Sequence, residues 1–406
     1  MAKKPTILLR NGWQSFNIGD IGHWMGALSL IRRYIPEAHV YLWPIADLDQ
    51  STALLDNYDN VEMVHGRIEK NGSCNPWLRE IIEASDFLLH GSGASISVGA
   101  LEGWRAATDK PYGCLGVSFT GGRYGTLFAD RLAPEVVDTL SGAEFIYTRE
   151  TDTLRFLKNQ GVAGPSLDFV PDTTFAFDTP DTAKADDYLS LHSLEDEQFM
   201  VVLPKLRIDP YWRYRATTTP IAEVEEREAV NARWRGYDNG FLCEAIVRWV
   251  HETGGRVLIC PEMVYEMEVE ERDVLPHLDD SVRDHVVCMN RFWLPDEAFA
   301  VYRRSRLMVS IEMHSPILSV VAGRPAIHLR QPTDSPKAQM WNDLGFGDWL
   351  FPLDQSEPAD VVDRMMSIHQ DYEGAKDVVR RGVAEAHERH RRAMLQVRSL
   401  LGLGEQ

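Results

Sequence analysis

The sequence predicts an α/β protein with two doubly wound lobes and a cleft between them. Short apolar runs alternate with segments of helical period, and this alternation starts twice along the chain. The length of 406 residues also exceeds what one hydrophobic core usually holds. Parallel strands need crossover helices, and open sheets of this kind bind ligands outside the carboxyl ends of their strands.

The first lobe is expected over residues 1–178. Its helices are predicted near 23–34 and 151–161, where apolar residues recur with helical spacing. Its strands are predicted in the short apolar runs TILLRNG (6–12), HVYLWP (39–44), VEMVHG (61–66), DFLLHGSG (86–93), YGCLGVSFT (112–120), EFIYTRE (144–150) and SLDFVPDTTFAF (166–177).

An acidic stretch with a proline, residues 179–198, lacks a sustained period and is predicted to be a linker. The second lobe follows over 199–356, with helices expected near 241–255, 295–305 and after residue 314. Residues 357–406 form a helical segment rich in Arg and His, expected to pack back on the first lobe. The strands of the second lobe are predicted in FMVVLPK (199–205), RVLICPE (256–262), HVVCMNR (285–291), RLMVSIE (306–312) and PAIHLR (325–330).

Composition narrows the class of protein. Hydrophobic residues make up 44% and charged residues 25%, as in soluble globular proteins. The formal net charge of −19 disfavours a nucleic-acid binder or an anionic-membrane binder. The first residues contain too short an apolar run for a signal peptide or a membrane anchor, so a cytoplasmic location is expected. Five scattered cysteines have no metal-binding or disulfide spacing and are interpreted as buried apolar residues.

Two strand ends in the first lobe carry candidate binding residues. After the first strand, Asn17, Gly19 and Asp20 open a helix, where free N–H groups favour an anion or a hydroxyl-rich ligand. The alternative is simple capping of that helix by Asn17 or Asp20. The second strand end carries His90, Gly91, Ser92 and Gly93, whose glycines permit close approach of a ligand. Its alternative is a tight turn without a ligand.

Arg149 also ends a strand, ahead of a helix that Thr151 or Asp152 is expected to cap. It can clamp a carboxylate or phosphate, or form a structural ion pair. In the second lobe, Lys205 and Arg207 follow the first strand, and about 30 residues of loop are expected before the next helix. Aromatic residues in that loop can stack on a sugar while arginines hold its acidic groups; the alternative is local packing of the loop on itself. The candidates are Tyr211, Trp212, Arg213, Tyr214, Arg215, Arg233 and Trp234.

Glu312 and His314 are expected at the junction between an apolar strand and a helix, with Ser315 as the cap and Pro316 in the first turn. Strand alternation points Met313 to the core and the other two side chains to the cleft. An imidazole next to a carboxylate at such a position is a credible general acid or phosphate ligand.

In this order the motifs resemble those of the polysaccharide pyruvyl transferase family. The resemblance spans about residues 5–330 and rests on Asn17 to Asp20, His90 to Gly93, Arg149 with Glu150, Pro171 with Asp172, and the segment with Met313, His314, Gly323 and Pro325. It implies two Rossmann-like lobes of the GT-B type. The implied activity is transfer of pyruvate from phosphoenolpyruvate to a sugar hydroxyl as a ketal, with phosphoenolpyruvate as co-substrate and neither a metal nor another cofactor.

The resemblance implies a basic residue two positions before the motif histidine, where this chain has Glu312. Lys205 and Arg207 are therefore expected to act as the anion clamps, with His314 as acid or phosphate ligand. Three alternatives remain open: a pyruvyl-ketal hydrolase with Glu312 and His314 as acid/base pair, a glycosyltransferase that uses a nucleotide sugar, and a non-catalytic binding module. The expected partners are a small-molecule donor and a sugar or glycan acceptor, with neither nucleic acid nor membrane insertion, and a homo-oligomer is compatible with the sequence.

Overall fold

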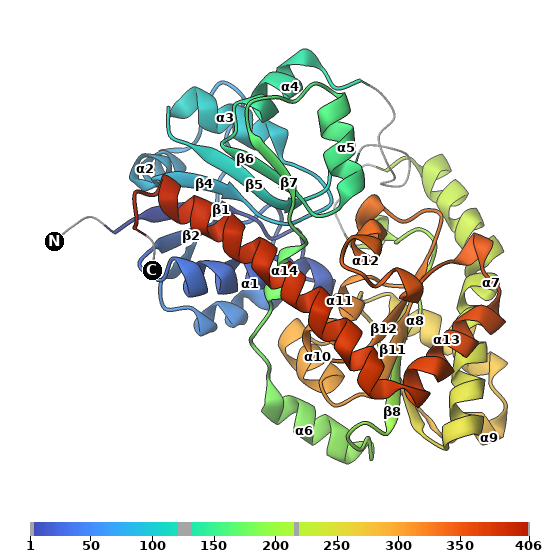
Figure 1. Cartoon of the computed structure of the whole chain (residues 1–406). Coiled ribbons are helices and arrows are strands. Elements are labelled where there is room, and N and C mark those ends of the chain that lie inside the picture. The colour runs from blue at the N-terminus through green and yellow to red at the C-terminus, as the bar shows by residue number, and fades with distance from the viewer. Residues whose placement is uncertain (1–3, 121–130, 215–218, 405–406) are drawn as a thin grey trace.

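The computed structural model describes residues 4–120, 131–214 and 219–404. Within them, seven parallel strands form the first sheet, in the order β3-β2-β1-β4-β5-β6-β7 (Figure 1). The elements of this lobe are β1 (Thr6–Arg10), α1 (Ile18–Tyr34), β2 (His39–Trp43), η1 (Asp49–Asn57), β3 (Val61–Met63), α2 (Pro76–Ala84), β4 (Phe87–His90), α3 (Val98–Ala107), β5 (Tyr112–Val117), α4 (Pro134–Ser141), β6 (Phe145–Thr148), α5 (Thr151–Asn159), β7 (Ser166–Phe169) and η3 (Thr173–Ala176).

A second parallel sheet of six described strands has the order β10-β9-β8-β11-β12-β13. Its lobe contains α6 (Thr182–Leu191), β8 (Phe199–Leu203), η4 (Tyr211–Arg213), α7 (Ile221–Thr253), β9 (Arg256–Ile259), α8 (Glu266–Val269), η5 (Glu270–Val274), η6 (Leu275–His277), α9 (Asp280–Arg283), β10 (Val286–Cys288), α10 (Pro295–Tyr302), β11 (Leu307–Ser310), α11 (His314–Val321), β12 (Ala326–Arg330), η7 (Pro336–Ala338), α12 (Gln339–Asp343), η8 (Gly347–Trp349), β13 (Leu350–Pro352) and η9 (Leu353–Gln355).

Both sheets are covered by helices on their two faces, which explains why their central strands are continuous apolar runs. All five residues of β8 are fully buried. In each sheet the strand order reverses once, between β1 and β4 in the first and between β8 and β11 in the second. Such a reversal opens a crevice at the carboxyl ends of the two central strands.

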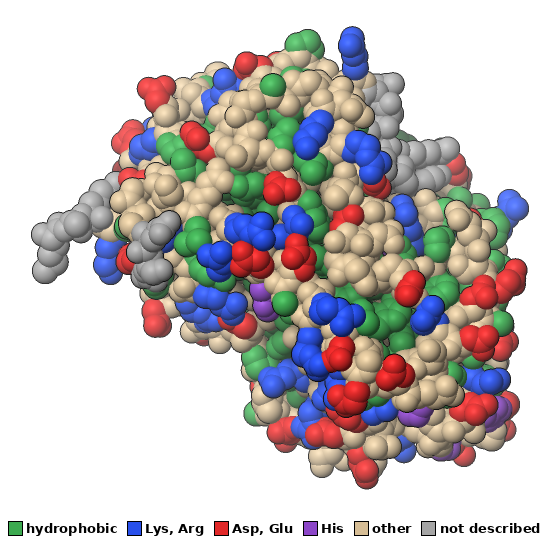
Figure 2. Space-filling model, in the orientation of Figure 1, with side chains coloured by type: hydrophobic (Ala, Val, Ile, Leu, Met, Phe, Trp, Pro, Cys, Tyr) green, Lys and Arg blue, Asp and Glu red, His purple; other side chains and the backbone are tan. Residues whose placement is uncertain are grey.

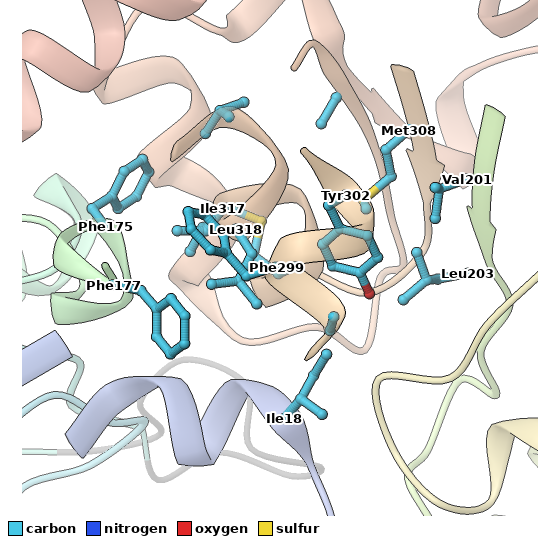
Figure 3. Close-up of a cluster of buried hydrophobic side chains, with 14 of the residues drawn as sticks. Ile18, Phe175, Phe177, Val201, Leu203, Phe299, Tyr302, Met308, Ile317 and Leu318 are labelled. Atoms are coloured by element: carbon cyan, nitrogen blue, oxygen red, sulfur yellow. The ribbon is translucent and has the colours of Figure 1, made fainter. Parts of the chain in front are cut away.

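The two lobes share one hydrophobic cluster. Figure 3 shows Ile18 of α1 and Phe177 of the first lobe beside Phe299 of α10 and Ile317 of α11. Each of these four side chains is at most 6% exposed. Because apolar side chains from both lobes lose water together, burial in this cluster holds the lobes against each other.

The segment predicted as a linker, 179–198, is more ordered than its sequence indicated. It contains α6, whose Asp181 side chain caps the helix by accepting a hydrogen bond from Lys184 N at 3.1 Å. The helix packs against α10. The sequence did not indicate this helix, because a single capped helix with few apolar residues leaves little periodic signal.

Residues 357–406 form two helices, α13 (Pro358–Gln370) and α14 (Tyr372–Leu400). Figure 1 shows α14 crossing from the second lobe to the first, where it packs on α1 and η3. Arg398 pairs with Glu37 through two hydrogen bonds of 2.9 and 3.0 Å, and His390 Nε2 lies 2.9 Å from Pro171 O. The C-terminal segment therefore lies back on the first lobe, as the sequence predicted.

Charges of both signs are interleaved on the molecular face in Figure 2. Along α14, for example, Arg389 pairs with Glu385, and Arg391 and Arg392 pair with Glu388. This face therefore has no broad basic patch of the kind that binds nucleic acid. In the described part of the chain, each helix is either too short or too polar to cross a bilayer.

Candidate active site

A cavity of about 580 Å³ lies between the lobes, at the strand-order reversal of the second sheet. The first lobe contributes residues near the N-terminal end of α1, among them Asn17, Asp20 and His23. The second lobe contributes residues that follow β8, β11 and β12, among them Glu312 and His314. Glu312 and His314 thus lie at the interlobe cavity, while Met313 is fully buried, as strand alternation predicted.

His314 is the first residue of α11, and Glu262 holds it in place. Glu262 follows β9, and its Oε1 lies 2.9 Å from His314 Nδ1. Its other oxygen accepts a hydrogen bond of 2.6 Å from Ser315 N. The carboxylate therefore accepts from the free N–H group at the start of α11, a capping role that the sequence predicts for Ser315. Ser315 lies inside the helix instead, and its hydroxyl accepts from Tyr302 OH at 3.2 Å.

Backbone hydrogen bonds bring the start of α1 against the second lobe. Ile18 N donates to Glu262 O at 2.9 Å, and Val264 N donates to Phe16 O at 3.1 Å. Asn17 caps α1, because its Oδ1 accepts from Gly19 N at 2.7 Å and from Asp20 N at 3.3 Å. The capping interpretation of Asn17 is therefore what the structure shows, and the capped turn borders the cavity.

Gly19 is required by the close approach of α1 to His314. A Cβ at this position would lie 2.2 Å from His314 Nδ1. We expect Gly19→Ala to displace the imidazole and to lower the free energy of unfolding by about 1–3 kcal/mol, as overpacked sites do. Urea unfolding measures this change. Gly236→Ala on α7, where a Cβ meets nothing within 4 Å, is the control and should leave stability equal or higher.

His23, Asp172 and Arg149 extend the cluster into the first lobe. His23 Nε2 lies 3.0 Å from His314 Nε2 and 3.1 Å from Asp172 Oδ2. Arg149 donates to Asp172 Oδ2 at 3.0 Å and to Ser118 Oγ at 2.7 Å. Arg149 is 1% exposed and borders the cavity, so it is at once a buried ion-pair partner and a cation near the ligand space. The helix after it, α5, is capped by neither Thr151 nor Asp152, because Asp343 of α12 accepts from Thr151 N at 2.9 Å.

Lys205 and Arg207 lie at the cavity, but acidic side chains already surround them. Lys205 Nζ is 3.1 Å from Asp334, 3.5 Å from Glu312 and 3.9 Å from Asp209. Arg207 donates two hydrogen bonds of 2.8 Å to Asp238 and another of 2.6 Å to Asp354. Lys205 thus compensates the charge of Glu312. The prediction that these two residues are the main anion clamps fits poorly, because their charge is already neutralised.

Burial dominates the acid–base properties of this site. It raises the pKa of Glu312 and the pKa of Glu262, in both cases against the nearby lysines. The pKa of Glu266 is raised well above its usual range by burial and by Glu312, whose carboxyl group it meets. Burial, together with the Lys337 and His23 charges, holds the pKa of His314 well below its usual range. These three glutamic acids therefore hold their protons to higher pH than free carboxyl groups do, and burial favours the neutral form of the His314 imidazole. The pKa of Asp172, in contrast, is held well below its usual range, because the effect of its burial is outweighed by the His23 and Arg149 charges.

The residues of this site that the sequence did not predict include His23, Glu262 and Lys337. Glu262 and Lys337 follow strands β9 and β12, so the rule of inspecting strand ends was sufficient to find them. His23 gave no signal, because it resembles any buried residue of a helix. Lys337 borders the cavity and is half-buried. Among the described residues it forms no ion pair within 4 Å, although its charge opposes the raised pKa of Glu262 and of Glu312. It is therefore a cation available to an anionic ligand.

The strand end from His90 to Gly93 serves packing. A Cβ at Gly91 or Gly93 would lie 2.1 Å from the Asn11 amide or the Trp13 indole. Ser92 Oγ accepts a hydrogen bond of 2.8 Å from Thr173 N. The cavity is bordered by the next residue, Ala94, and not by these four. The structure thus favours the tight-turn interpretation of this motif.

His90 predicts an acid-sensitive contribution to stability. Burial lowers its pKa to about 4, and its Nε2 accepts a hydrogen bond from Ser97 N. The folded state therefore binds fewer protons than the unfolded state between pH 4 and 6.5, so stability falls as the pH falls below 6.5. We expect His90→Gln to reduce the loss of unfolding free energy between pH 7 and 5 by about 2 kcal/mol. Urea unfolding at both pH values tests this, and equal losses in both proteins would contradict it.

The loop after Arg207 is shorter than the predicted length of about 30 residues. Helix α7 begins at Ile221, so Arg233 and Trp234 lie on a helix, with the Arg207 guanidinium 4.0 Å from the Trp234 ring centre. Tyr211 borders the cavity. Trp212 lies under the Arg227 guanidinium, and Arg213 pairs with Glu228 and Glu268, away from the cavity lining. Arg215 lies outside the described residues.

Comparisons with known proteins agree with this geometry. A family model described as polysaccharide pyruvyl transferase matches residues 17–331. No curated protein sequence matches the chain. Similar solved structures include Anabaena Alr3699/HepE in complex with UDP and glucose (TM-score 0.57, 10% identity, covering 97% of this chain and 99% of that one). A second is S. aureus MnaA with UDP (TM-score 0.57, 12% identity, covering 98% of each chain). A third is UDP-GlcNAc 2-epimerase from Neisseria meningitidis (TM-score 0.55, 11% identity, covering 98% of this chain and 99% of that one). The fold is thus the two-lobed α/β arrangement of the GT-B type.

Proposed function

This chain belongs to the polysaccharide pyruvyl transferase family, and we propose that it transfers pyruvate from phosphoenolpyruvate to a sugar as a ketal, in the cytoplasmic synthesis of a surface glycan. The observation that carries the proposal is the Glu262–His314 pair. It lies at the strand-order reversal of the second sheet, beside a cavity bordered by both lobes. A donor and an acceptor bound between the lobes can meet there.

The reaction requires proton transfer and charge stabilisation. The enol carbon of phosphoenolpyruvate gains a proton and becomes a methyl group, two sugar oxygens bond to the adjacent carbon, and the carbon–oxygen bond to phosphate breaks. Of the two hydroxyl protons, one balances the new methyl hydrogen and the other leaves with phosphate. The site therefore needs a proton-transfer group near the reacting carbon and cations for the carboxylate and phosphate.

We assign these roles to residues that border the cavity. Lys337 is the main cation for the donor, because Lys205 and Arg207 are surrounded by carboxylates. Arg149, although paired with Asp172, is a second cation at the cavity. His314 presents Nε2 to the reacting oxygens, since Glu262 engages its Nδ1. Glu312, two residues before His314, is the carboxyl group placed to carry the proton.

The test incubates the purified chain with phosphoenolpyruvate and a panel of sugar acceptors. We expect phosphate release that depends on the acceptor, and a sugar product that carries a pyruvyl ketal in mass spectrometry. UDP-glucose, chosen because similar structures contain UDP, serves as the control donor. A folded protein that transfers glucose and releases no phosphate would be a glycosyltransferase and would overturn the proposal.

One observation favours a second candidate, hydrolysis of a pyruvyl ketal. Lys205 and Arg207 are neutralised, which leaves fewer cations than phosphoenolpyruvate, with its phosphate and carboxylate, calls for. A pyruvyl ketal carries a single carboxylate. Water would take the place of the sugar hydroxyl, and the products would be free pyruvate and the sugar. Release of pyruvate from a pyruvylated sugar, with no reaction of phosphoenolpyruvate, would identify this activity.

A further inference from the structure

Three potential metal ligands converge at the interlobe cavity from three separate elements. They are His23 on α1, His314 on α11, and Asp172, which caps η3. One ligand atom from each lies within 4.8 Å of the others. The three residues are 0–5% exposed, and His23 and His314 border the cavity.

The protons of the two imidazoles are too few to give every ring nitrogen a hydrogen-bond partner. His314 Nδ1 faces the Glu262 carboxylate at 2.9 Å, which leaves the lone pair on Nε2. That lone pair faces His23 Nε2 at 3.0 Å, and His23 Nε2 also lies 3.1 Å from Asp172 Oδ2. A single His23 proton would have to serve both neighbours. The buried His23 Nδ1 would then be left without a hydrogen-bond partner.

We propose that His23, Asp172 and His314 bind a divalent transition-metal cation. With a cation at their centre, both Nε2 lone pairs and the Asp172 oxygen point to one positive charge. Each imidazole then carries its proton on Nδ1. Glu262 lies 2.9 Å from His314 Nδ1, the position from which a carboxylate orients a metal-binding histidine. Asp20 lies 3.8 Å from His23 Nδ1, beyond hydrogen-bonding distance, and supplies a negative charge on that side.

Asp172 is held by its own set of donors. Its Oδ1 accepts hydrogen bonds from Thr174 N at 2.9 Å and from Thr174 Oγ1 at 2.8 Å. Its Oδ2 accepts from Arg149 and has a second lone pair directed to the His23 side. The carboxylate is therefore fixed before any cation binds, as a high-affinity site requires.

The ligand set selects the class of metal. Two imidazole nitrogens and one carboxylate oxygen suit Zn²⁺, Mn²⁺ or Fe²⁺, whereas Mg²⁺ and Ca²⁺ prefer oxygen ligands throughout. With metal–nitrogen bonds of about 2.1 Å, nitrogens 3.0 Å apart subtend about 90° at the metal. That angle is typical of six-coordinate ions bound on one face by two histidines and a carboxylate. Because His23 and His314 border the cavity, the remaining coordination positions would be available to an oxygen ligand from there.

The metal site would be part of the proposed active site. Only the identity of the oxygen ligand rests on the proposed function. In a pyruvyl transferase the ligand would be the donor carboxylate or a sugar hydroxyl. His314 Nε2 would then reach the substrate through the cation. The family resemblance implies a metal-free reaction, and the sequence alone does not place His23 or Asp172 beside His314.

Metal binding can be tested without any substrate. Untagged full-length protein is freed of metal with a chelator and titrated with Zn²⁺ and with Mn²⁺ in a calorimeter. We expect one equivalent of at least one of these ions to bind and to raise the Tm. Co²⁺ loading should give absorption bands typical of nitrogen and oxygen ligands. His23→Gln and Asp172→Asn should each weaken binding at least 100-fold, while exposed His65→Ala should not change it.

Absence of stoichiometric binding by folded protein would overturn the proposal, and so would unchanged affinity in both ligand variants. Circular dichroism verifies that the variants are folded. If Asp172→Asn does not fold, His23→Gln and the Co²⁺ spectrum of the unmodified protein decide the question. Binding that is lost in the variants, combined with no reaction of phosphoenolpyruvate, would support the metal site and contradict the pyruvyl transferase activity instead.

Discussion

Replacement of His314 by alanine is expected to lower kcat by about 10²–10⁴-fold, in the range that removal of a group from the reacting centre usually causes. The side chain borders the cavity, and Glu262 and His23 hold it there at 2.9 and 3.0 Å. Alanine removes the nitrogen that meets the substrate, whether directly or through a bound cation. Phosphate release under saturating phosphoenolpyruvate and acceptor measures the change.

Two further variants make this result specific. His65→Ala removes an exposed histidine of the first lobe and should keep full activity. Glu262→Gln keeps the size of the side chain but weakens its hold on the imidazole, so an intermediate loss of about 10–100-fold is expected. If His314→Ala retains most of its kcat while Glu262→Gln does not, His314 is not the reacting group.

The fold was predictable because both sheets are fully covered. Parallel strands buried on two faces read as short apolar runs, and each strand of the second sheet from β8 to β12 coincides with a predicted run. The start of α7 was not predicted. Its arginines and aromatic residues resembled a binding loop, yet Trp234, Tyr237 and Phe241 recur with helical spacing and their rings pack against one another.

The site was predictable where its residues follow strands, because strand ends in open α/β sheets carry the chemistry. Glu312 and His314 were found by this rule, and Arg149 and Lys205 were placed at the cavity by it. The role of Lys205 was not predictable, since its three acidic neighbours come from three different segments of the chain. His23 was missed for the same reason, because only the approach of α1 to α11 gives it a partner.

Arg149 is expected to make the largest single contribution to stability among the cavity residues. Its guanidinium is 1% exposed, and it pairs with Asp172 at 3.0 Å and lies 3.7 Å from Glu150. Both carboxylates are fully buried, and burial raises the pKa of Glu150 to about 7 against the opposing effect of Arg149. Removal of the cation therefore leaves buried acidic groups without their counter-charge.

Arg149→Met should lower the free energy of unfolding by about 3–5 kcal/mol, the usual cost of leaving a buried charge unpaired. Methionine fills much of the volume of arginine. A decrease of that size in the free energy of unfolding would therefore come mainly from the lost charge and less from lost packing. Arg155→Met on α5 removes an exposed arginine paired with Asp152 and should cost about 0–1 kcal/mol. Urea unfolding at pH 7 compares the three proteins. Equal costs in the two variants would mean that the buried pair adds nothing beyond a surface one, and that the Asp172 carboxylate is stabilised by Thr174 and His23 without Arg149.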